Sequence, residues 1–403
     1  MKSLGYLSKK IEFKQAINYL LYVFILLAIA ISLQKLFQGQ RDFWGHTQTH
    51  YNNYVIFKTS FIHLVEQVNL YDLYEKEYGD FYKYSPTFAV LMAPFYYLPD
   101  WLGLILWNLL NCLFLFYGFV KLPNLTDKVK SFILALSILE LITSMQNQQS
   151  NAMIAGFLLL AFVSFEKNKI PQAAFLIMLC LFIKLTGALA CVLFLFYRDK
   201  PKFVIWSFIW FIGMAALPLL FVDLNYLVLQ YENWGKLLAE DHLQSYGISI
   251  FGIIHSWFNS EPSKAIVLII GLLFFLLPLI RTDRFKEYDF RLKYLCALLI
   301  WIVIFNHKAE SSSYIVAIAG CAIWFFISDK SILNVFLIFL AFVLISLSPT
   351  DIFPKAIRES LIVPLVLKAV PALLIWIKIT FELSSFGNQR YFRKNFPAKE
   401  MQK

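Results

Sequence analysis

Long apolar runs, separated by short polar breaks, dominate the chain. A helix needs about 20 apolar residues to cross a bilayer, and by this criterion the sequence predicts about twelve spans. The predicted spans are 16–37, 101–120, 131–145, 152–166, 171–184, 187–197, 203–222, 264–280, 292–306, 313–327, 331–348 and 359–380. We therefore expect an all-α polytopic membrane protein, a bundle of about twelve transmembrane helices with loops and interfacial helices on its outer face.

Basic residues are unevenly distributed between the loops. With the N-terminus inside the cell, the predicted inner segments hold most of the 36 Lys and Arg residues, for example in RTDRFKEYDFRLK (281–293). Cytoplasmic loops of membrane proteins are enriched in these residues. We therefore expect a multi-pass protein of the cell (inner) membrane with both termini in the cytoplasm. The long loops 38–85 and 223–263 then face outward, and we expect the active site on that face.

Composition agrees with this class and argues against others. Hydrophobic residues make up 59% of the chain and charged residues 15%, against roughly 25% charged in ordinary soluble proteins. The net charge of +10 is not gathered into a basic stripe on a soluble domain, so we expect no nucleic-acid partner. The five cysteines lie in apolar runs without metal or disulfide spacing, and no metal site is predicted. We expect one transmembrane domain, 1–380, and a basic cytoplasmic tail, 381–403.

The first long loop begins with QGQRDFWGHTQTHYNN (38–53) and carries Asp42 close to the end of the first span. Apolar side chains at helical spacing over 52–68 predict an amphipathic helix, lying either in the outer membrane interface or packed on the protein. The tyrosine-rich segment 69–86 suits either sugar contacts or an interfacial aromatic belt. Prolines interrupt 86–98, which predicts a re-entrant or partial span.

Some polar residues interrupt apolar runs, where they are costly. A lysine at mid-span costs about 2.5–3.5 kcal/mol on insertion scales; Lys184 is either a cation for a phosphate or a lysine that snorkels at a span end. QNQQSN (146–151) either binds polar ligand groups or forms a short polar turn. Glu140 would orient Lys184 or another cation, or remain a neutral buried acid.

A second polar break, NHKAESSSYIV (306–316), places His307, Lys308 and Glu310 between two predicted spans. A cation beside an acid and hydroxyl groups suits a lipid phosphate. The alternative is a capped helix start, with Ser311 or Ser312 as the N-cap residue. The sequence leaves both open.

Taken in order, these segments resemble glycosyltransferase family GT87, polytopic GT-C enzymes related to the polyprenyl-phosphate-mannose-dependent α-mannosyltransferases. The resemblance covers roughly residues 38–330. It is carried by RDFWGHTQTHY, NLYDLY, YKYSPTFAVLMAPFYYLP, LWNLLN, QQSN, FIKLTGAL and NHKAESSSYIV. Gly187 stands where the family has a proline after the lysine, and Ser312 where bacterial relatives often have proline. These departures leave the acceptor and the bend near Lys184 open.

The resemblance implies an inverting hexosyltransferase that moves a sugar from a polyprenyl-phosphate donor to a lipid or glycan acceptor. Mannose is the family's best-known donor sugar. Asp42 matches the family's outward-facing acid and would act as general base on the acceptor hydroxyl, with Asp72 and Asp80 as rivals. No cofactor is implied beyond the lipid-phosphate sugar as co-substrate, and metal dependence is open.

The leaving phosphate in such a reaction develops negative charge and needs fixed cations. The candidate residues for binding the donor phosphate or the substrates are Lys184, His307, Lys308, Glu310, Gln149, Asn151 and Tyr84. The segment HLQSYGISIFG (242–252) resembles a family segment that would help to bind the acceptor, or is an ordinary turn.

Two other functions compete with glycosyl transfer. A carrier that flips a lipid-linked sugar or exports a polysaccharide would line a central path with charges and show repeat symmetry, and the sequence shows neither. A glycan polymerase or ligase would carry an essential outer arginine or histidine pair rather than an acid after the first span.

Overall fold

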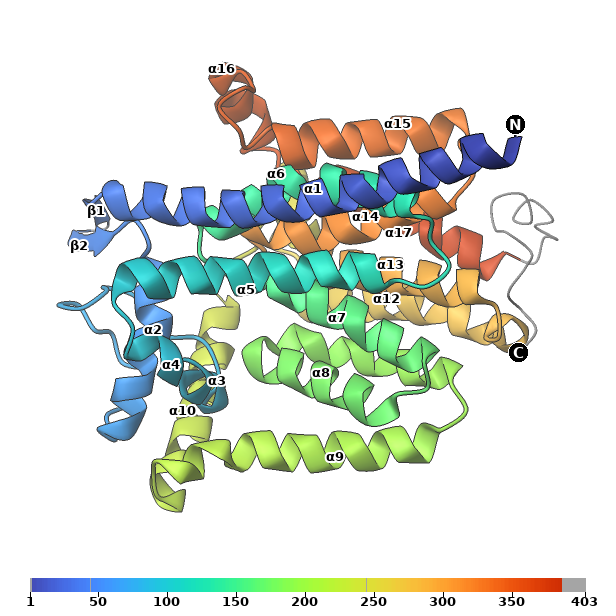
Figure 1. Cartoon of the computed structure of the whole chain (residues 1–403). Coiled ribbons are helices and arrows are strands. Elements are labelled where there is room, and N and C mark those ends of the chain that lie inside the picture. The colour runs from blue at the N-terminus through green and yellow to red at the C-terminus, as the bar shows by residue number, and fades with distance from the viewer. Residues whose placement is uncertain (1, 44, 244, 386–403) are drawn as a thin grey trace.

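The computed structural model describes residues 2–43, 45–243 and 245–385, and it is a helical bundle with one short hairpin (Figure 1). The first half contains α1 (Lys2–Phe37), β1 (Gln40–Phe43), β2 (His46–Thr49), α2 (Asn52–Val65), α3 (Pro86–Leu91), α4 (Ala93–Tyr96), α5 (Asp100–Lys121), α6 (Asp127–Gln146), α7 (Asn151–Glu166), α8 (Ile170–Ile183) and the 3₁₀ helix η1 (Leu185–Phe196).

The second half begins with α9 and includes short 3₁₀ and π-helical turns at several helix ends. Its elements are α9 (Lys200–Ala216), η2 (Leu217–Leu220), α10 (Leu224–Leu243), α11 (Ile250–Phe258), α12 (Lys264–Leu276), η3 (Leu277–Ile280), η4 (Thr282–Arg284), α13 (Tyr288–Ile304), η5 (Ser311–Ser313), α14 (Tyr314–Ile327), α15 (Ile332–Ala341), η6 (Phe342–Leu347), α16 (Lys355–Ile357), η7 (Arg358–Ile362) and α17 (Ala369–Ser384).

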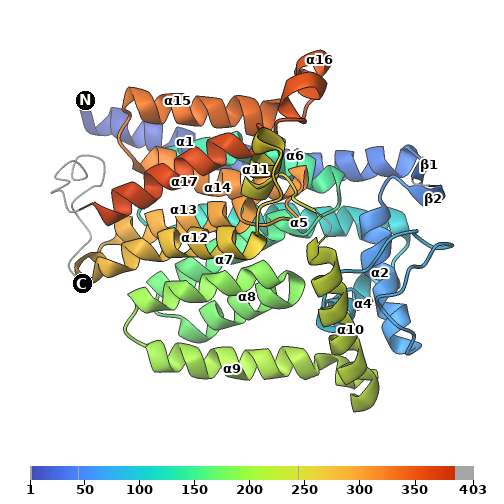
Figure 2. The ribbon, with the colours of Figure 1, turned by 180° about the vertical axis from the view of Figure 1, so that it is seen from behind.

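The core of the bundle lies on α7, α13 and α14, which are buried on nearly all sides because they are apolar all round. α7 packs between α5 and α8, and α14 packs against α13 and α6. Seen from behind, α12 and α17 lie along α13 (Figure 2). α5 and α7 approach so closely that a Cβ at Gly156 would lie 2.3 Å from the backbone of Phe114. Glycine is therefore required at that crossing.

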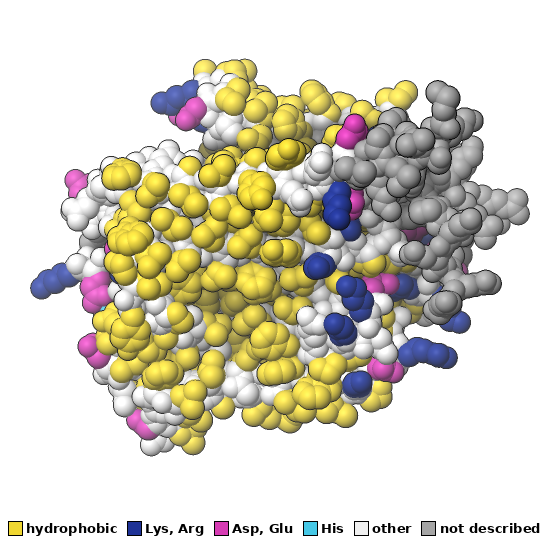
Figure 3. Space-filling model, viewed as in Figure 1, with side chains coloured by type: hydrophobic (Ala, Val, Ile, Leu, Met, Phe, Trp, Pro, Cys, Tyr) yellow, Lys and Arg dark blue, Asp and Glu magenta, His cyan; other side chains and the backbone are white. Residues whose placement is uncertain are grey.

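The two ends of the bundle differ in the segments that they carry. The start of α1, the α12–α13 connection and the end of α17 lie at the same end of the bundle (Figure 1), and we call this the basic end. The β1–β2 hairpin and α2 lie at the opposite end, which we call the loop end (Figure 1). Asn53 contacts the α6–α7 turn and Asn151 contacts the turn 306–313, so both turns lie at this end too. In the face shown in Figure 3, Lys and Arg side chains gather towards the basic end, beside a broad hydrophobic surface. This asymmetry agrees with the charge distribution that the sequence predicts.

The helical membrane class is confirmed, but the expected number of spans is not. Among the described residues, four helices are long and apolar enough to cross a membrane, and six shorter apolar helices accompany them. The four are Glu12–Phe37, Asp100–Lys121, Asp127–Gln146 and Lys200–Leu220. The tail over 386–403 lies outside the described residues, so the predicted boundary at residue 380 stays a prediction.

The predicted span 359–380 is wrong as a single helix. The chain forms a π-helical turn over 358–362 and irregular turns over 363–368, and α17 begins only at Ala369. Val366 has φ +52°, a left-handed conformation that a β-branched residue rarely adopts. The helix is therefore broken where the sequence shows an unbroken apolar pattern.

The first long loop is a folded part of the bundle. α2 packs on α3 and α4 and buries residues from both faces, including Ser60 and His63, so the alternative of a helix packed on the protein is confirmed. Tyr71, Tyr78 and Tyr82 are buried, which excludes an interfacial belt for these three. The interrupted apolar stretch forms the short helices α3 and α4 rather than a complete span.

Candidate functional site

The α6–α7 turn is held in place from α5. Gln148 has φ +50°, and its carbonyl accepts a 2.7 Å hydrogen bond from Trp107 Nε1. The Asn111 side-chain oxygen accepts from the backbone N–H of Met153, 3.2 Å away, in the otherwise unpaired first turn of α7. The polar residues of QNQQSN therefore have fixed positions at the loop end.

Lys184 lies at a helix break, as the sequence predicts. α8 ends at Ile183, and Lys184 is extended, with φ −143° and ψ 123°. A Cβ at Gly187 would lie 2.5 Å from Cys180 Cβ, so glycine lets η1 fold back on α8. The Phe182 carbonyl accepts a hydrogen bond from Ser85 Oγ, which connects the end of α8 to the first loop. Lys184 therefore lies in the connection between α8 and η1, beside the first loop.

Four of the predicted site residues meet at the Lys184 ammonium group. Nζ donates to Asn151 Oδ1 at 2.7 Å and to Gln149 Oε1 at 3.4 Å. The Tyr84 hydroxyl donates to the same Gln149 oxygen at 3.0 Å, and its ring centroid lies 5.9 Å from Nζ. None of the ion pairs found in the described part of the chain involves Lys184. We call Lys184, Gln149, Asn151 and Tyr84 the lysine–amide cluster.

The turn before α14 joins this cluster. Asn151 Nδ2 donates to Ser312 Oγ at 3.4 Å, and Ser312 Oγ donates to Glu310 Oε2 at 3.3 Å. The Glu310 carboxylate is near enough to interact electrostatically with both Lys184 and Tyr84. Glu310 forms a capping box with Ser313 at the start of η5, so the predicted N-caps at Ser311 or Ser312 are wrong.

His307 and Lys308 lie just before Glu310 on the same turn, and the second long loop packs on them. Ser245 Oγ donates to the His307 carbonyl at 3.2 Å, and the Ile248 N–H donates to the Ala309 carbonyl at 2.7 Å. A Cβ at Gly247 would lie 2.6 Å from the His307 carbonyl oxygen, so this contact requires glycine. The segment that resembles an acceptor-binding region therefore contacts the turn that carries these residues.

Asp42 is at the loop end but outside the lysine–amide cluster. It lies in β1, opposite Thr47, is exposed to solvent, and accepts a 3.1 Å hydrogen bond from Thr47 Oγ1. Gln48 fixes the hairpin by donating to the Tyr78 carbonyl at 2.8 Å. The rival acids Asp72 and Asp80 are also in the first loop, where they accept hydrogen bonds from Asn69 and from the Phe81 N–H.

One charged pair beside the site was not predicted. The fully buried Glu140 carboxylate accepts from Lys368 Nζ at 3.0 and 3.2 Å. Glu140 therefore pairs with a cation other than Lys184, which was one of the alternatives for this residue. The alternative that Glu140 orients Lys184 by direct contact is wrong. The sequence held a signal for Lys368: it is a lone charge in LIVPLVLKAVPALLIW (361–376), the same criterion that marked Lys184.

The structure therefore defines an integral membrane protein, a bundle of apolar helices with a lysine held by amide oxygens at one end. The sequence model of glycosyltransferase family 87 matches residues 81–349, and the chain belongs to this family. It is thus a membrane glycosyltransferase, as the motif resemblance predicts. The match includes the lysine–amide cluster and His307, Lys308 and Glu310, whereas Asp42 precedes it. Comparison with curated proteins gives no match.

Proposed function

We propose that the protein transfers a sugar, with mannose as the first candidate, from a polyprenyl-phosphate donor to a lipid or glycan acceptor at the outer face of the cell membrane. The observation that carries this proposal is the lysine–amide cluster. Lys184 is held by two neutral amide oxygens at 2.7 and 3.4 Å, so its positive charge is not cancelled by a directly bonded carboxylate. Such a cation suits the phosphate of the donor.

The chemistry requires one bond to form and one to break. The acceptor oxygen attacks the anomeric carbon, the bond from that carbon to the phosphate oxygen breaks, and the configuration inverts. The negative charge that develops on the phosphate is stabilised by Lys184, with His307 and Lys308 as further candidates. Gln149 and Asn151 hold the ammonium group, and Glu310 and Tyr84 are further candidates for binding the substrates. Membrane lipids surround the site, so both lipid-linked substrates reach it without leaving the bilayer.

Asp42 is the proposed base that takes the proton from the acceptor hydroxyl. Support comes from its place just beyond α1 and from its exposed carboxylate, which has a single hydroxyl partner. Asp72 and Asp80 remain rivals in the same loop.

The orientation is part of the proposal. The basic end would face the cytoplasm, with both termini there, because Lys and Arg are enriched in cytoplasmic segments. The loop end would face outward. Membership in the glycosyltransferase family favours a transferase over a carrier or exporter, and over a polymerase or ligase.

Sugar transfer by purified protein in lipid tests the proposal. Polyprenyl-phosphate-mannose would be the donor and a membrane extract the acceptor, for the wild type, Asp42→Asn and the matched variants Asp72→Asn and Asp80→Asn. We expect transfer by the wild type and a loss of about 10²-fold or more in Asp42→Asn alone. Equal rates for the wild type and Asp42→Asn would move the base to another residue. If folded wild type transfers no sugar from any lipid phosphate, the proposed donor class is wrong.

A further inference from the structure

The Glu140–Lys368 pair lies inside the bundle, behind the candidate site. The Glu140 side chain is 0% exposed and the Lys368 side chain 6%. Burying two charges is costly, and apolar residues of similar volume are often as stabilising as a buried ion pair. Packing alone therefore does not account for this pair.

Lys368 uses its remaining hydrogen bonds on the turn that carries the site residues. Its Nζ donates to Ser311 Oγ at 2.7 Å and to the Ser311 carbonyl at 3.3 Å. The same ammonium group lies 5.0 Å from the centre of the Tyr314 ring. Ser311 belongs to η5 and Tyr314 begins α14, so one buried cation holds both.

η5 also contacts the lysine–amide cluster. Ser312 and Asn151 are hydrogen-bonded at 3.4 Å, and Asn151 accepts from Lys184 at 2.7 Å. The turn thus contacts Lys368 directly through Ser311, and it is linked to Lys184 through Ser312 and Asn151. A shift of η5 would move the amide that positions the Lys184 ammonium group.

The backbone before Lys368 is bent to place it there. Val366 adopts the left-handed conformation, with φ +52°. Its side chain packs against Gly252, where an added Cβ would lie 3.4 Å from Val366 Cγ1. Such strain persists only where the surrounding structure imposes it, and it concentrates at functional sites. The break in the helix lets the Lys368 side chain reach both Glu140 and Ser311.

We propose that Lys368, held by Glu140, is a positioning residue for the transfer reaction: it fixes the turn 310–313 so that Ser312 and Asn151 hold Lys184 against the donor phosphate. The inference rests on the proposed function, which it deepens. Lys368 itself does not touch the substrate, because its ammonium group is already bonded to Glu140 and Ser311.

The test replaces the pair by neutral residues of similar size in the double variant Glu140→Gln/Lys368→Met. A single substitution would leave one buried charge unpaired and endanger folding, whereas the double variant removes both charges. We expect a folded protein whose kcat/KM with polyprenyl-phosphate-mannose falls about 10- to 100-fold, because small misplacements in a site cost up to about 10²-fold. Ser311→Ala keeps the ion pair and removes only one link to η5, and we expect it to lower kcat/KM severalfold.

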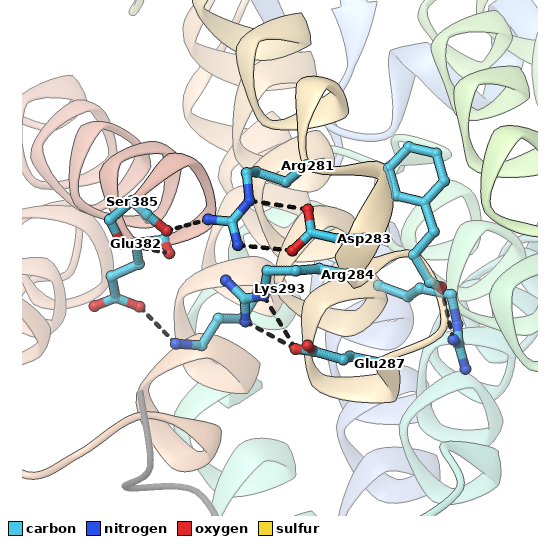
Figure 4. Close-up of polar contacts among 9 residues, drawn as sticks. Arg281, Asp283, Arg284, Glu287, Lys293, Glu382 and Ser385 are labelled. Carbon is cyan, nitrogen blue, oxygen red and sulfur yellow. Dashed lines mark hydrogen bonds and ion pairs between the residues drawn. The ribbon is translucent and has the colours of Figure 1, made fainter. Parts of the chain in front are cut away.

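A second buried ion pair provides the matched control. Lys293 Nζ lies 2.6 Å from Glu382 Oε2 at the basic end, and the two side chains are 6% and 8% exposed (Figure 4). The double variant Lys293→Met/Glu382→Gln should change the thermal midpoint but keep kcat/KM within about twofold of wild type.

The outcomes separate the inference from the proposed function. Wild-type kcat/KM in either the double variant at Glu140 and Lys368 or Ser311→Ala would overturn the positioning role and leave the proposed function intact. An equal loss in the Lys293–Glu382 control would also overturn it, because any buried pair would then have the same effect. Absence of transfer by the folded wild type would instead overturn the proposed function.

Discussion

Lys184 at the loop end and the ion-paired cations Arg291 and Lys293 at the basic end are held in different ways. At the basic end, two cations are bonded directly to carboxylates inside the bundle: Arg291 binds both oxygens of Glu166, at 2.6 and 2.8 Å, and Lys293 binds Glu382. At the loop end, Lys184 is bonded to the amide oxygens of Gln149 and Asn151. Figure 4 shows how closely charges are paired at the basic end, where Arg281 and Arg284 also bind acids.

The difference separates charges that stabilise the fold from a charge that is available to a ligand. A bidentate arginine–carboxylate pair is nearly neutral as a unit and has little attraction left for an anion. Amide oxygens orient an ammonium group without cancelling its charge, which is the arrangement that stabilises a developing phosphate charge. Lysine is therefore structural where it pairs with a carboxylate, as in Lys293, and available to a ligand where only amides hold it, as in Lys184.

Among the changes that test this comparison, removing the Lys184 charge should lower the rate of transfer the most. We expect Lys184→Met to lower kcat for transfer by about 10²–10³-fold, the usual consequence of losing one group that stabilises developing charge. Lys130→Met is the matched control, because Lys130 Nζ donates to the Val120 carbonyl at 2.7 Å near the basic end. A loss of less than about threefold in Lys184→Met would remove this lysine from the phosphate site.

Giving Lys184 a carboxylate partner, as Lys293 has at the basic end, should have the next largest effect on transfer. Asn151→Asp keeps the shape of the side chain and gives Lys184 a carboxylate partner. We expect the KM for polyprenyl-phosphate-mannose to rise about 10-fold or more, because hydrogen bonds to charged groups are worth about 1.5–3 kcal/mol. Asn168→Asp adds the same charge at an exposed position of the basic end, and it should leave KM unchanged. Equal KM values for Asn151→Asp and the wild type would contradict the role of an uncancelled charge.

Breaking a pair at the basic end should alter stability and not catalysis. The Arg291 and Glu166 side chains are 13% and 11% exposed, so Glu166→Gln should lower the free energy of unfolding by about 2 kcal/mol, between the values for surface and buried pairs. Denaturation in detergent measures this loss, and transfer assays on the folded fraction should give wild-type kcat/KM. A selective loss of activity would show that the basic end also serves the reaction.

Local sequence patterns predicted the features of the fold and the site that depend on residues close together in the chain. The break at Lys184, the polar turn QNQQSN and the helix after Tyr51 all follow from periodicity and from the cost of a charge in an apolar run. The family resemblance added Tyr84 to these, and its hydrogen bond to Gln149 joins it to the same cluster.

The long-range contacts were not predictable from pattern. Glu140 and Lys368 are 228 positions apart, and no spacing rule connects them. The left-handed Val366 breaks an apolar run that reads as one helix. The β1–β2 hairpin has a short polar sequence with weak strand signals, so the position of Asp42 opposite Thr47 had no local signature.

The smallest expected effect concerns pH, which should act on the two ends differently. At the loop end, the buried His63 ring stacks on Tyr74 at 3.9 Å and lies near Tyr78, and its Nε2 is 3.0 Å from Glu77. Burial lowers the pKa of His63 below its ordinary value of 6.5, against the opposing effect of Glu77 and Glu66. At the basic end, Arg281, Arg284 and Arg291 form ion pairs with acids, and arginine keeps its charge at any moderate pH.

The direction of the pH effect follows from the lowered pKa. The unfolded chain takes up the proton on His63 more readily than the folded protein, so this residue's contribution to stability is complete above pH 6.5 and is lost as the pH falls below that value. The thermal midpoint of the wild type should therefore fall between neutral pH and about pH 5, and His63→Gln should reduce that fall. Glu166→Gln at the basic end should leave the slope unchanged. If His63→Gln keeps the full wild-type slope, then acids elsewhere cause the acid sensitivity, and His63 does not distinguish the two ends.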